Sequence, residues 1–166
     1  MILIVAGVAG SGKSTLGELI SDKLGWEFAD GDSFHSATNI AKMRAGRPLD
    51  DSDRWPWLAA IGAWMDERTA AGQSAVVACS ALARRYREAL LARRPQARMV
   101  FLELSREQAQ MRCHVRHGHF FGAAMVASQF AELEPPEPDE DRVLALPSTK
   151  PPEQLADIVI ADFGLR

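Results

Sequence analysis

The sequence predicts an α/β fold, in which helices cover both faces of a five-stranded parallel sheet. Short apolar, β-branched runs alternate along the chain with segments of helical periodicity, and this alternation is typical of a parallel sheet. The first apolar run leads directly into a glycine-rich loop and then into a helical segment. At 166 residues the chain has the length of one domain, so we expect a single domain over residues 1–166.

The first half of the chain is expected to form two strands and three helices. The apolar run 1–6 predicts a strand, and the helix after the loop is expected to end at Gly25. A second strand is expected at 26–29 and a short helix at 37–45. A long helix should open at Ser52 or Asp53, with Pro56 in its first turn, and end at Gly72. Its apolar positions recur at helical spacing: Trp57, Ile61, Trp64 and Met65.

The second half repeats the alternation of strands and helices. Strands are expected at 75–79, 99–104 and 143–146, and an arginine-rich helix between the first two of these is expected to run up to Pro95. Ser105 and Gln108 form a capping box for a helix that reaches about residue 116. An exposed loop at 118–124, a helix at 125–133 and a solvated connector rich in proline and acid at 134–141 follow. Thr149 is expected to cap the last helix, with Pro151 in its opening turn.

A phosphate-binding loop is expected between the first strand and the first helix. Residues 7–14 fit the pattern G-x-x-x-x-G-K-[ST]: Gly7, Val8, Ala9, Gly10, Ser11, Gly12, Lys13 and Ser14. Backbone N–H groups of such a loop, together with the helix N-terminus, bind phosphate. Lys13 should reach the β- and γ-phosphates, Ser14 should bind Mg²⁺, and Thr15 follows them in the same site. A glycine-rich turn without a ligand is the alternative, but the flanking elements favour a nucleoside triphosphate.

Two acids follow the second predicted strand, at the sheet edge where such folds bind ligands. Asp30 and Asp32 are two residues apart, so one carboxylate can hold Mg²⁺ through water while the other takes or orients an acceptor hydroxyl. An Asx-type turn is the alternative interpretation of Asp-Gly-Asp. Beside a phosphate loop, the pair favours phosphoryl transfer to a hydroxyl.

Arg112 and Arg116 are four residues apart and therefore share one face of a predicted helix. Either side chain could reach phosphate when the following loop closes, and we expect Arg116 to be catalytic. Arg112 and Pro151 are the candidates for contacts to the nucleotide. A metal site in the histidine-rich stretch at 113–119 is the less favoured interpretation, because no carboxylate completes it.

Other notable side chains have structural interpretations. Arg84, Arg85 and Arg87 are expected to form a solvated helix face. Trp55 lies off the apolar face of the long helix and could line an acceptor pocket. Cys79 lies in an apolar run and is expected to be buried.

Composition excludes several classes of function. A net charge of −3 argues against a nucleic-acid surface, which needs clustered lysine and arginine. Cys79 and Cys113 lie outside any C-x-x-C pair, so neither a zinc site nor a disulfide framework is indicated. The first apolar run lacks the basic flank of a signal peptide, and no stretch has the length of a membrane span. A cytoplasmic location is therefore expected.

Several strings resemble the gluconokinase family of small sugar-acid kinases, and the similarity runs from residue 3 to about residue 160. The strings are Asp-Gly-Asp-Ser-Phe-His at 30–35, Asn-Ile-Ala-Lys-Met at 39–43, Asp-Arg-Trp-Pro-Trp-Leu at 53–58, Ala-Cys-Ser-Ala-Leu at 78–82, Gly-His-Phe at 118–120, and Ser-Gln-Phe at 128–130 with Leu-Glu at 133–134. Those at 53–57 and 79–82 are far more selective than the phosphate loop.

The resemblance implies a three-layer P-loop kinase fold similar to that of nucleoside-monophosphate kinases. It implies a mobile lid at about 112–126 and an acceptor-binding segment at about 32–58. It further implies ATP- and Mg²⁺-dependent phosphorylation of D-gluconate at the 6-hydroxyl, a homodimer, and entry of the product into the pentose phosphate route.

The resemblance also implies roles for matching residues. Lys13 and Ser14 keep their phosphate and magnesium roles, and Asp32 becomes the acceptor-orienting residue or general base, which leaves Asp30 at the metal. Three further residues become candidates for gripping the gluconate hydroxyls and carboxylate: His35, Lys42 and Arg54. Arginine can bind a carboxylate in bidentate fashion. A salt bridge from Arg54 to Asp50, Asp51 or Asp53 is the alternative.

Two positions depart from the family pattern. Ala83 stands where the family usually has lysine, which weakens any claim for a cation there unless Arg84 or Arg85 supplies it. Phe121 stands where methionine is common, an apolar exchange of small effect.

Two rival functions stay open at this level. One is another small-molecule kinase acting on shikimate or a nucleotide, although shikimate kinases typically carry a Gly-Gly-Gly run that is absent here. The other is a regulator that binds a nucleotide and catalyses no reaction. Such a protein would not need acids and lid arginines around one binding site.

Overall fold

The computed structural model describes residues 1–115 and 123–166. Five parallel strands form one sheet in the order β2-β3-β1-β4-β5. The strands are β1 (Ile2–Gly7), β2 (Glu27–Asp30), β3 (Ala75–Ala78), β4 (Ala97–Glu103) and β5 (Val143–Pro147). The predicted α/β fold is confirmed, and the central position of β1 puts the loop that follows it at the middle of the sheet's carboxyl edge.

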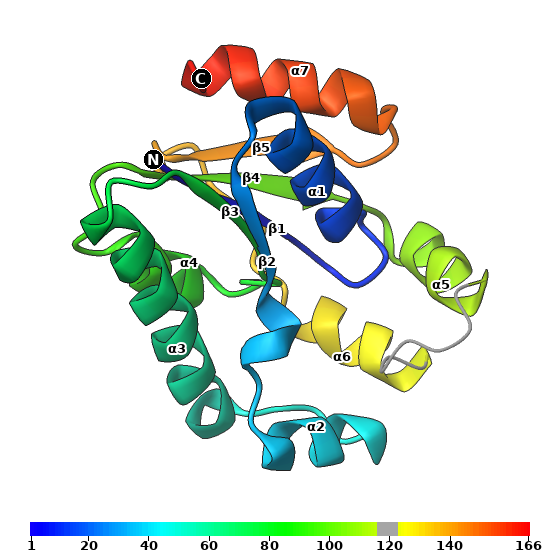
Figure 1. The fold of residues 1–166 in the computed structure, drawn as a ribbon. Coiled ribbons are helices and arrows are strands. Elements are labelled where there is room, and N and C mark those ends of the chain that lie inside the picture. Colours follow the sequence, from blue (N-terminus) through cyan, green and yellow to red (C-terminus); the bar gives the residue numbers. More distant parts are fainter. Residues whose placement is uncertain (116–122) are drawn as a thin grey trace.

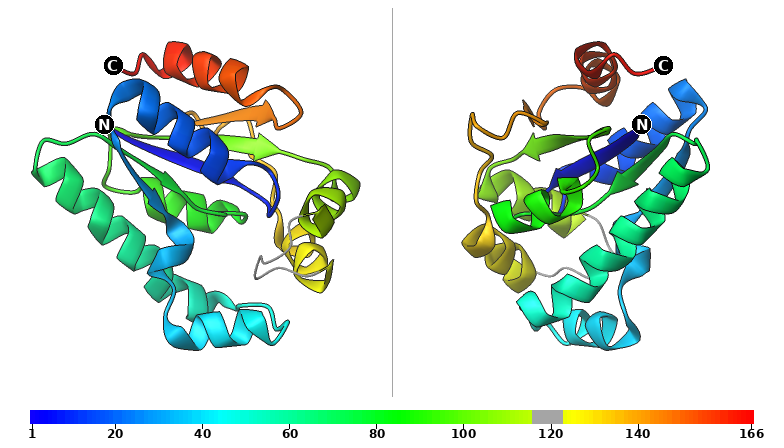
Figure 2. Two further views of the ribbon diagram at one scale, coloured as in Figure 1. Left: turned by 45° about the vertical axis from the view of Figure 1, so that its right-hand side comes forward. Right: turned by 90° about the vertical axis from the view of Figure 1, so that its left-hand side faces the viewer.

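Helices cover both faces of this sheet (Figure 1). On one face α1 (Lys13–Leu24) packs beside α7 (Pro152–Phe163), and on the other α3 (Asp51–Ala70) packs beside α4 (Arg84–Leu91). Four elements gather around the carboxyl ends of the strands (Figure 2): the 3₁₀ helix η1 (Gly31–Phe34), α2 (Ala37–Arg44), α5 (Arg106–Val115) and α6 (Ala123–Glu132). None of the helices in the described ranges combines the length and apolar character that a membrane span requires.

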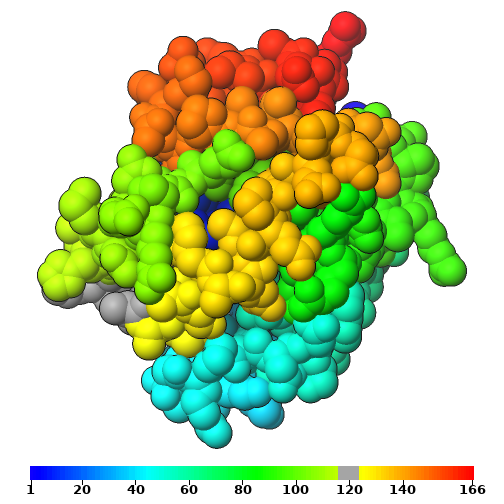
Figure 3. All heavy atoms as spheres, turned by 180° about the vertical axis from the view of Figure 1, so that it is seen from behind, coloured from blue at the N-terminus to red at the C-terminus, as the bar shows by residue number. Residues whose placement is uncertain are grey.

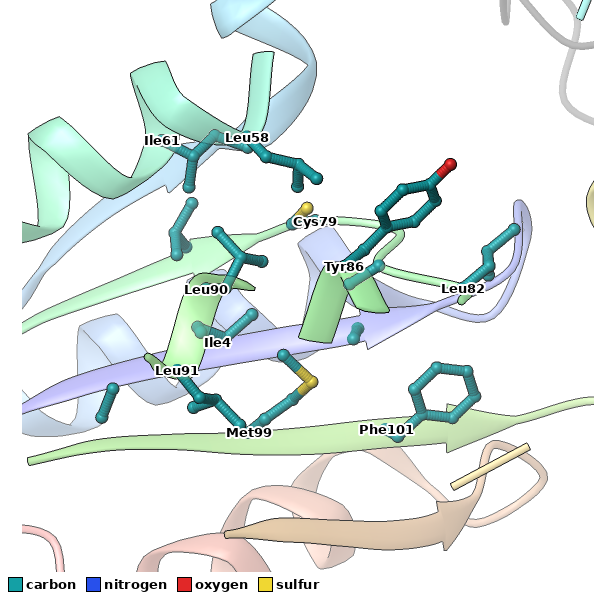
Figure 4. Packing of buried hydrophobic residues seen from close by; sticks show 14 of the residues in the cluster. Ile4, Leu58, Ile61, Cys79, Leu82, Tyr86, Leu90, Leu91, Met99 and Phe101 are labelled. Atoms are coloured by element: carbon teal, nitrogen blue, oxygen red, sulfur yellow. The ribbon is translucent and has the colours of Figure 1, made fainter. Parts of the chain in front are cut away.

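The strand β1 serves two hydrophobic clusters because its side chains alternate between the faces. Ile4 belongs to the cluster under α3 and α4, and Leu3 and Val5 belong to the cluster under α1 and α7. Figure 4 shows side chains of α3 and α4 meeting those of β1 and β4, with the hydroxyl of Tyr86 pointing away from the apolar side chains. Burial of both sheet faces fixes the register of the central strand and so the position of the loop after it.

Local signals located most element ends within one or two residues. The capping box of α5 is confirmed, with mutual 3.2 Å hydrogen bonds between Ser105 and Gln108. The long helix opens earlier than predicted, because Asp50 is its N-cap and forms a capping box with Asp53. The arginine-rich helix is shorter than predicted and ends at Leu91, with the next strand starting at Ala97.

The predicted cap of the last helix is wrong. The N-cap of α7 is Pro151, and no side chain caps the helix. Proline holds the residue before it extended, so Thr149 is carried away from the first turn. Pro152 at the start of the helix has no N–H to be capped.

The solvated-face prediction holds for two arginines of α4 and is wrong for the third. Arg84 and Arg85 form surface ion pairs, but Arg87 is fully buried. Its guanidinium makes two hydrogen bonds of 2.7 and 2.8 Å to Glu140 and donates to the carbonyl oxygen of Leu82. The connector at 134–141 is therefore fastened to α4 rather than solvated throughout.

Candidate active site

The phosphate-binding loop joins β1 to α1 in the conformation that the glycines permit. Gly7 has a φ of +141°, and a Cβ there would lie 2.7 Å from the carbonyl oxygen of Leu102 on the neighbouring strand. The Nζ of Lys13 donates a 3.0 Å hydrogen bond to the carbonyl oxygen of Val8, so the ammonium group lies across the loop. Burial lowers the pKa of Lys13, and the carboxylates of Asp32 and Asp30 oppose this shift.

The two acids after β2 lie beside this loop. Asp30 accepts a 2.9 Å hydrogen bond from the backbone N–H of Asp32 through Oδ1, and its Oδ2 accepts one of 3.2 Å from the hydroxyl of Ser14. The Asx-type turn of the alternative interpretation is therefore present, and Asp30 within it lies beside Ser14. Gly31 between them allows close approach to β3, because a Cβ would lie 2.3 Å from the carbonyl oxygen of Ala78.

The oxygens of Ser14 and Asp30 fit a hard divalent cation. A hydroxyl and a carboxylate 3.2 Å apart are the donor types that Mg²⁺ prefers, with water and substrate phosphates filling the other positions. Within the part of the chain that the structure describes, no three histidine, cysteine or acidic side chains form a further metal cluster. His117 and His119 lie outside the described residues.

Two cavities meet at Lys13 and Asp32. The first is lined by the phosphate loop, Ser14 and Asp30, and the second by side chains of η1, α3 and α6. Lys13 and Asp32 line both. Seen from behind, α5 and α6 lie side by side, and N-terminal atoms in blue are visible in a hollow next to them (Figure 3). The cation and the carboxylate thus stand at the junction of a phosphate site and a second site.

His35 lines the second cavity as a neutral ring. It stacks on Trp57 at a centroid distance of 4.2 Å and an interplanar angle of 13°. Burial and, to a lesser degree, the positive charge of Arg54 lower the pKa of His35 to about 4. An uncharged imidazole can donate or accept a hydrogen bond to a substrate hydroxyl.

Arg54 lines the same cavity, but its partner is one that sequence analysis missed. It pairs with Glu132 of α6, rather than with Asp50, Asp51 or Asp53, and lies 3.3 Å from the hydroxyl of Tyr86. Nothing in the local pattern could have indicated this, because Glu132 is 78 residues away.

Lys42 is placed differently from the other substrate candidates. Its Nζ lies 2.6 Å from Asp53 and 3.7 Å from Asp50, and it does not line either of the two cavities described. Trp55, with 40% of its surface exposed, contacts the ring of Tyr86 edge-on and does not line them either. The structure therefore brings His35 and Arg54 to Asp32, but not Lys42 or Trp55.

Gln129 is a second residue that sequence analysis missed. Its Oε1 accepts a buried hydrogen bond of 2.7 Å from the backbone N–H of Ala9 in the phosphate loop. It lines the second cavity as well. The string Ser-Gln-Phe at 128–130 was the available signal, but it carried no indication of role.

Arg112 ties α5 to the phosphate loop. Its guanidinium donates to the carbonyl oxygen of Gly10 at 3.1 Å and to the hydroxyl of Ser148 at 2.8 Å. The Ser148 hydroxyl donates in turn to the carbonyl oxygen of Ser11 at 2.6 Å. Arg112 thus lies between the loop and the turn that leads to Pro151. Arg116, the predicted catalytic arginine, lies outside the described residues.

Neither Arg84 nor Arg85 supplies a cation to the two cavities in place of the lysine that Ala83 replaces in the family pattern. Ala83 is fully buried at the start of α4. Arg84 is engaged with Glu88 and Asp139, and Arg85 with Asp51. Neither side chain lines the two cavities.

Comparison with known proteins gives consistent matches along most of the chain. Residues 9–121 match the shikimate kinase family model. The gluconokinase of Gluconobacter oxydans (strain 621H) is 40% identical over 161 residues, which cover 97% of this chain and 90% of that protein.

Two solved structures are similar in both sequence and fold. A sugar kinase from Janibacter sp. HTCC2649 is 43% identical with a TM-score of 0.92, covering 99% of this chain and 94% of that one. A gluconokinase from Sinorhizobium meliloti 1021 is 41% identical with a TM-score of 0.84, covering 98% and 90%. The chain therefore belongs to the gluconokinase family and carries the sequence pattern of the shikimate kinase family.

Proposed function

We propose that this protein transfers the γ-phosphoryl group of ATP to the 6-hydroxyl of D-gluconate, giving 6-phospho-D-gluconate and ADP. The observation that carries the proposal is the position of Lys13 and Asp32, which line both the phosphate cavity and the second cavity. The gluconokinase relatives supply the identity of the acceptor.

The chemistry divides between the cation and the acid. Lys13 and the backbone N–H groups of the loop neutralise charge on the β- and γ-phosphates. Asp32 orients the acceptor hydroxyl and takes its proton during the transfer. In the same step the hydroxyl oxygen forms a bond to the γ-phosphorus, and the bond from that phosphorus to the β–γ bridging oxygen breaks. Lys13 at the junction stabilises the charge that develops on the transferred group.

We propose that Ser14 and Asp30 hold Mg²⁺. The ion would shield charge on the phosphates, as in other enzymes that transfer phosphoryl groups. The 3.2 Å contact between the two side chains keeps both oxygens beside the loop. Asp30 is in turn held by its bond to the backbone of Asp32.

The second cavity is the proposed gluconate site. His35 would contact a hydroxyl, and Arg54 would exchange Glu132 for the gluconate carboxylate, which it can bind in bidentate fashion. Lys42 would have to leave Asp53 to reach a substrate oxygen, which makes it the weakest of the three candidates.

The remaining parts of the proposal depend on the family resemblance. They are a lid at about 112–126 that carries Arg116, nucleotide contacts from Arg112 and Pro151, a homodimer and a cytoplasmic location. The bonds from Arg112 to Gly10 and Ser148 support a nucleotide role for the base of this lid.

The proposal is tested by ADP release with ATP and a set of acceptors: gluconate, shikimate, gluconolactone and nucleoside monophosphates. We expect gluconate to give the highest kcat/KM. Shikimate is the second candidate, because residues 9–121 match the shikimate kinase model. A higher kcat/KM for shikimate would contradict the proposal.

The variant Asp32→Asn tests the assigned base. It should lower kcat for gluconate about 10²–10⁴-fold, the usual contribution of a general base, while ATP still binds. Asp22→Asn, on the exposed side of α1, is the control and should keep the wild-type rate. A wild-type rate in Asp32→Asn would remove this residue from the mechanism.

A further inference from the structure

Asn39, a buried residue of α2, donates two hydrogen bonds from one side-chain nitrogen. Its Nδ2 lies 3.0 Å from the backbone carbonyl oxygen of Asp53 and 3.2 Å from Nδ1 of His35. A carbonyl oxygen can only accept, so the Asp53 contact determines which end of the amide carries the NH₂ group. The second hydrogen of that group is therefore directed at His35.

This contact settles which nitrogen of His35 carries the proton. Asn39 Nδ2 is a donor, so Nδ1 of His35 must accept and must be unprotonated. A neutral imidazole carries its one proton on the other nitrogen, Nε2. The ring plane is fixed as well, because His35 stacks on Trp57, whose indole N–H donates to the carbonyl oxygen of Gly31 at 2.7 Å.

The charged groups around His35 favour the neutral ring on balance. Lys13 of α1, Asp32 of η1 and Arg54 of α3 line the same cavity, and Glu132 of α6 is paired with Arg54. Burial and Arg54 lower the pKa of His35, whereas the negative charge of Asp32 acts in the opposite sense. Protonation at Nδ1 would also place two donors against each other at Asn39.

We propose that Asn39 is a positioning residue that holds His35 as a neutral Nε2–H donor to a hydroxyl oxygen of the acceptor. The nature of this acceptor, a sugar acid, rests on the proposed function. A neutral donor can bind a hydroxyl oxygen without competing with Arg54 for the substrate carboxylate. His35 and Arg54 together thus set the orientation of a polyhydroxy acid in the cavity, with its hydroxyl oxygens at His35 and its carboxylate at Arg54.

The proton position can be measured directly by nuclear magnetic resonance on protein labelled with ¹⁵N-histidine. His35→Gln assigns the signal among the four histidines of the chain. At neutral pH we expect His35 to be protonated on Nε2 alone. In Asn39→Asp the new carboxylate accepts from Nδ1, so the proton moves to Nδ1 and the pKa of His35 rises. A wild-type ring protonated on Nδ1 would overturn the inference.

The same variant gives a kinetic signature that structural damage would not produce. In Asn39→Asp the doubly protonated ring of His35 still donates from Nε2. The neutral ring of this variant carries its proton on Nδ1 and therefore cannot donate from Nε2. Its kcat/KM for gluconate should therefore fall as pH rises through the raised pKa of His35, reaching about tenfold below wild type, the value of one hydrogen bond. In the wild-type protein, titration of His35 should cause no such fall in kcat/KM.

Two further variants separate positioning from folding. Ser36→Ala removes the cap of the same helix, since the Ser36 hydroxyl accepts from the N–H of Asn39 at 3.1 Å, and should lower stability without changing the tautomer or the pH profile. Asn39→Leu leaves Nδ1 without its donor and should raise KM for gluconate with a mixture of tautomers. If Asn39→Leu keeps the wild-type tautomer and KM, the inference is wrong.

The tautomer measurement needs no substrate, which separates this inference from the proposed function. An Nε2–H ring in a protein that does not phosphorylate gluconate would reject the function alone. An Nδ1–H ring in an active gluconokinase would reject this inference alone.

Discussion

At the scale of single residues, Lys13 is the positive charge at the junction of the two cavities. Replacing it by alanine should lower kcat about 10²–10³-fold, the usual loss when one group that stabilises transition-state charge is removed. Lys23→Ala is the matched control, because this lysine lies at the exposed end of the same helix. Steady-state kinetics with circular dichroism checks both variants, and a wild-type rate in Lys13→Ala would contradict the assignment.

The two cysteines differ in accessibility although both line the phosphate cavity. Cys79 is buried, and burial raises its pKa to about 12, so its thiol should not react with iodoacetamide in the folded protein. Cys113 is half-buried and should react first, more slowly when MgATP fills the cavity. Mass spectrometry of the labelled protein checks both. Labelling of Cys113 at a rate independent of ATP would place the nucleotide elsewhere.

What the sequence could predict at this scale depended on local contacts. The Asp30–Asp32 turn closes within two residues, and the pattern Asp-Gly-Asp indicated it. Ser14 and Asp30 are 16 residues apart, and only the phosphate-loop motif and the rule for strand ends assigned them to one site. The partner of Arg54 could not be predicted, because Glu132 reaches it only after the chain has passed through β3, α4, β4 and α5. Three acids that are nearer in the sequence, Asp50, Asp51 and Asp53, were available as partners for the same arginine.

At the scale of elements, α6 joins the two halves of the site. Gln129 holds the N–H of Ala9 in the phosphate loop, and Glu132, one turn further on, holds Arg54 in the second cavity. The first residues of the helix also belong to the segment predicted to be the lid, at about 112–126. A movement of α6 would therefore alter the phosphate loop and the acceptor side together.

This arrangement predicts that Gln129→Leu weakens ATP binding. The variant leaves the buried N–H of Ala9 without its acceptor, and such a loss costs about 1–3 kcal/mol. A loss of this size corresponds to a rise of about five- to 150-fold in the Kd of ATP. Gln129→Glu keeps an acceptor for the N–H and is the control for stability. Calorimetric titration and thermal unfolding measure the two quantities. An unchanged Kd in Gln129→Leu would show that the bond does not shape the loop.

The ends of helices could likewise be predicted where the interactions that fix them are local in the sequence. The capping boxes of α3 and α5 close within four residues, so their chemistry is visible in the sequence. Only the box of α5 was predicted, and the start of α3 was placed one or two residues late. The cap of α7 was missed because two successive prolines override the preference of threonine. Arg87 was misplaced because its acceptor, Glu140, is 53 residues away.

At the scale of the whole molecule, the Arg87–Glu140 pair fastens the connector at 134–141 to α4. The side chain of Arg87 is 1% exposed and that of Glu140 is 5% exposed, so the pair is desolvated. The guanidinium also donates to the carbonyl oxygen of Glu134 at 2.9 Å, just after α6. The pair thus holds the connector between α6 and β5, and with it one end of the helix that lines the second cavity and is hydrogen-bonded to the phosphate loop.

Breaking this pair should destabilise the protein and flatten its response to acid. Arg87 lowers the pKa of Glu140 below the ordinary 4.5, so the stabilisation is present above pH 4.5 and is lost as pH falls through the lower, folded-state pKa. Glu140→Gln should lower the free energy of unfolding at neutral pH by about 3–5 kcal/mol and reduce its slope between about pH 5 and 3. Urea unfolding across this range measures both, with Glu153→Gln as the control because its partner Lys23 is at the surface. Equal losses in the two variants would mean that burial adds nothing to the Arg87 pair, and that α6 is held by its apolar contacts alone.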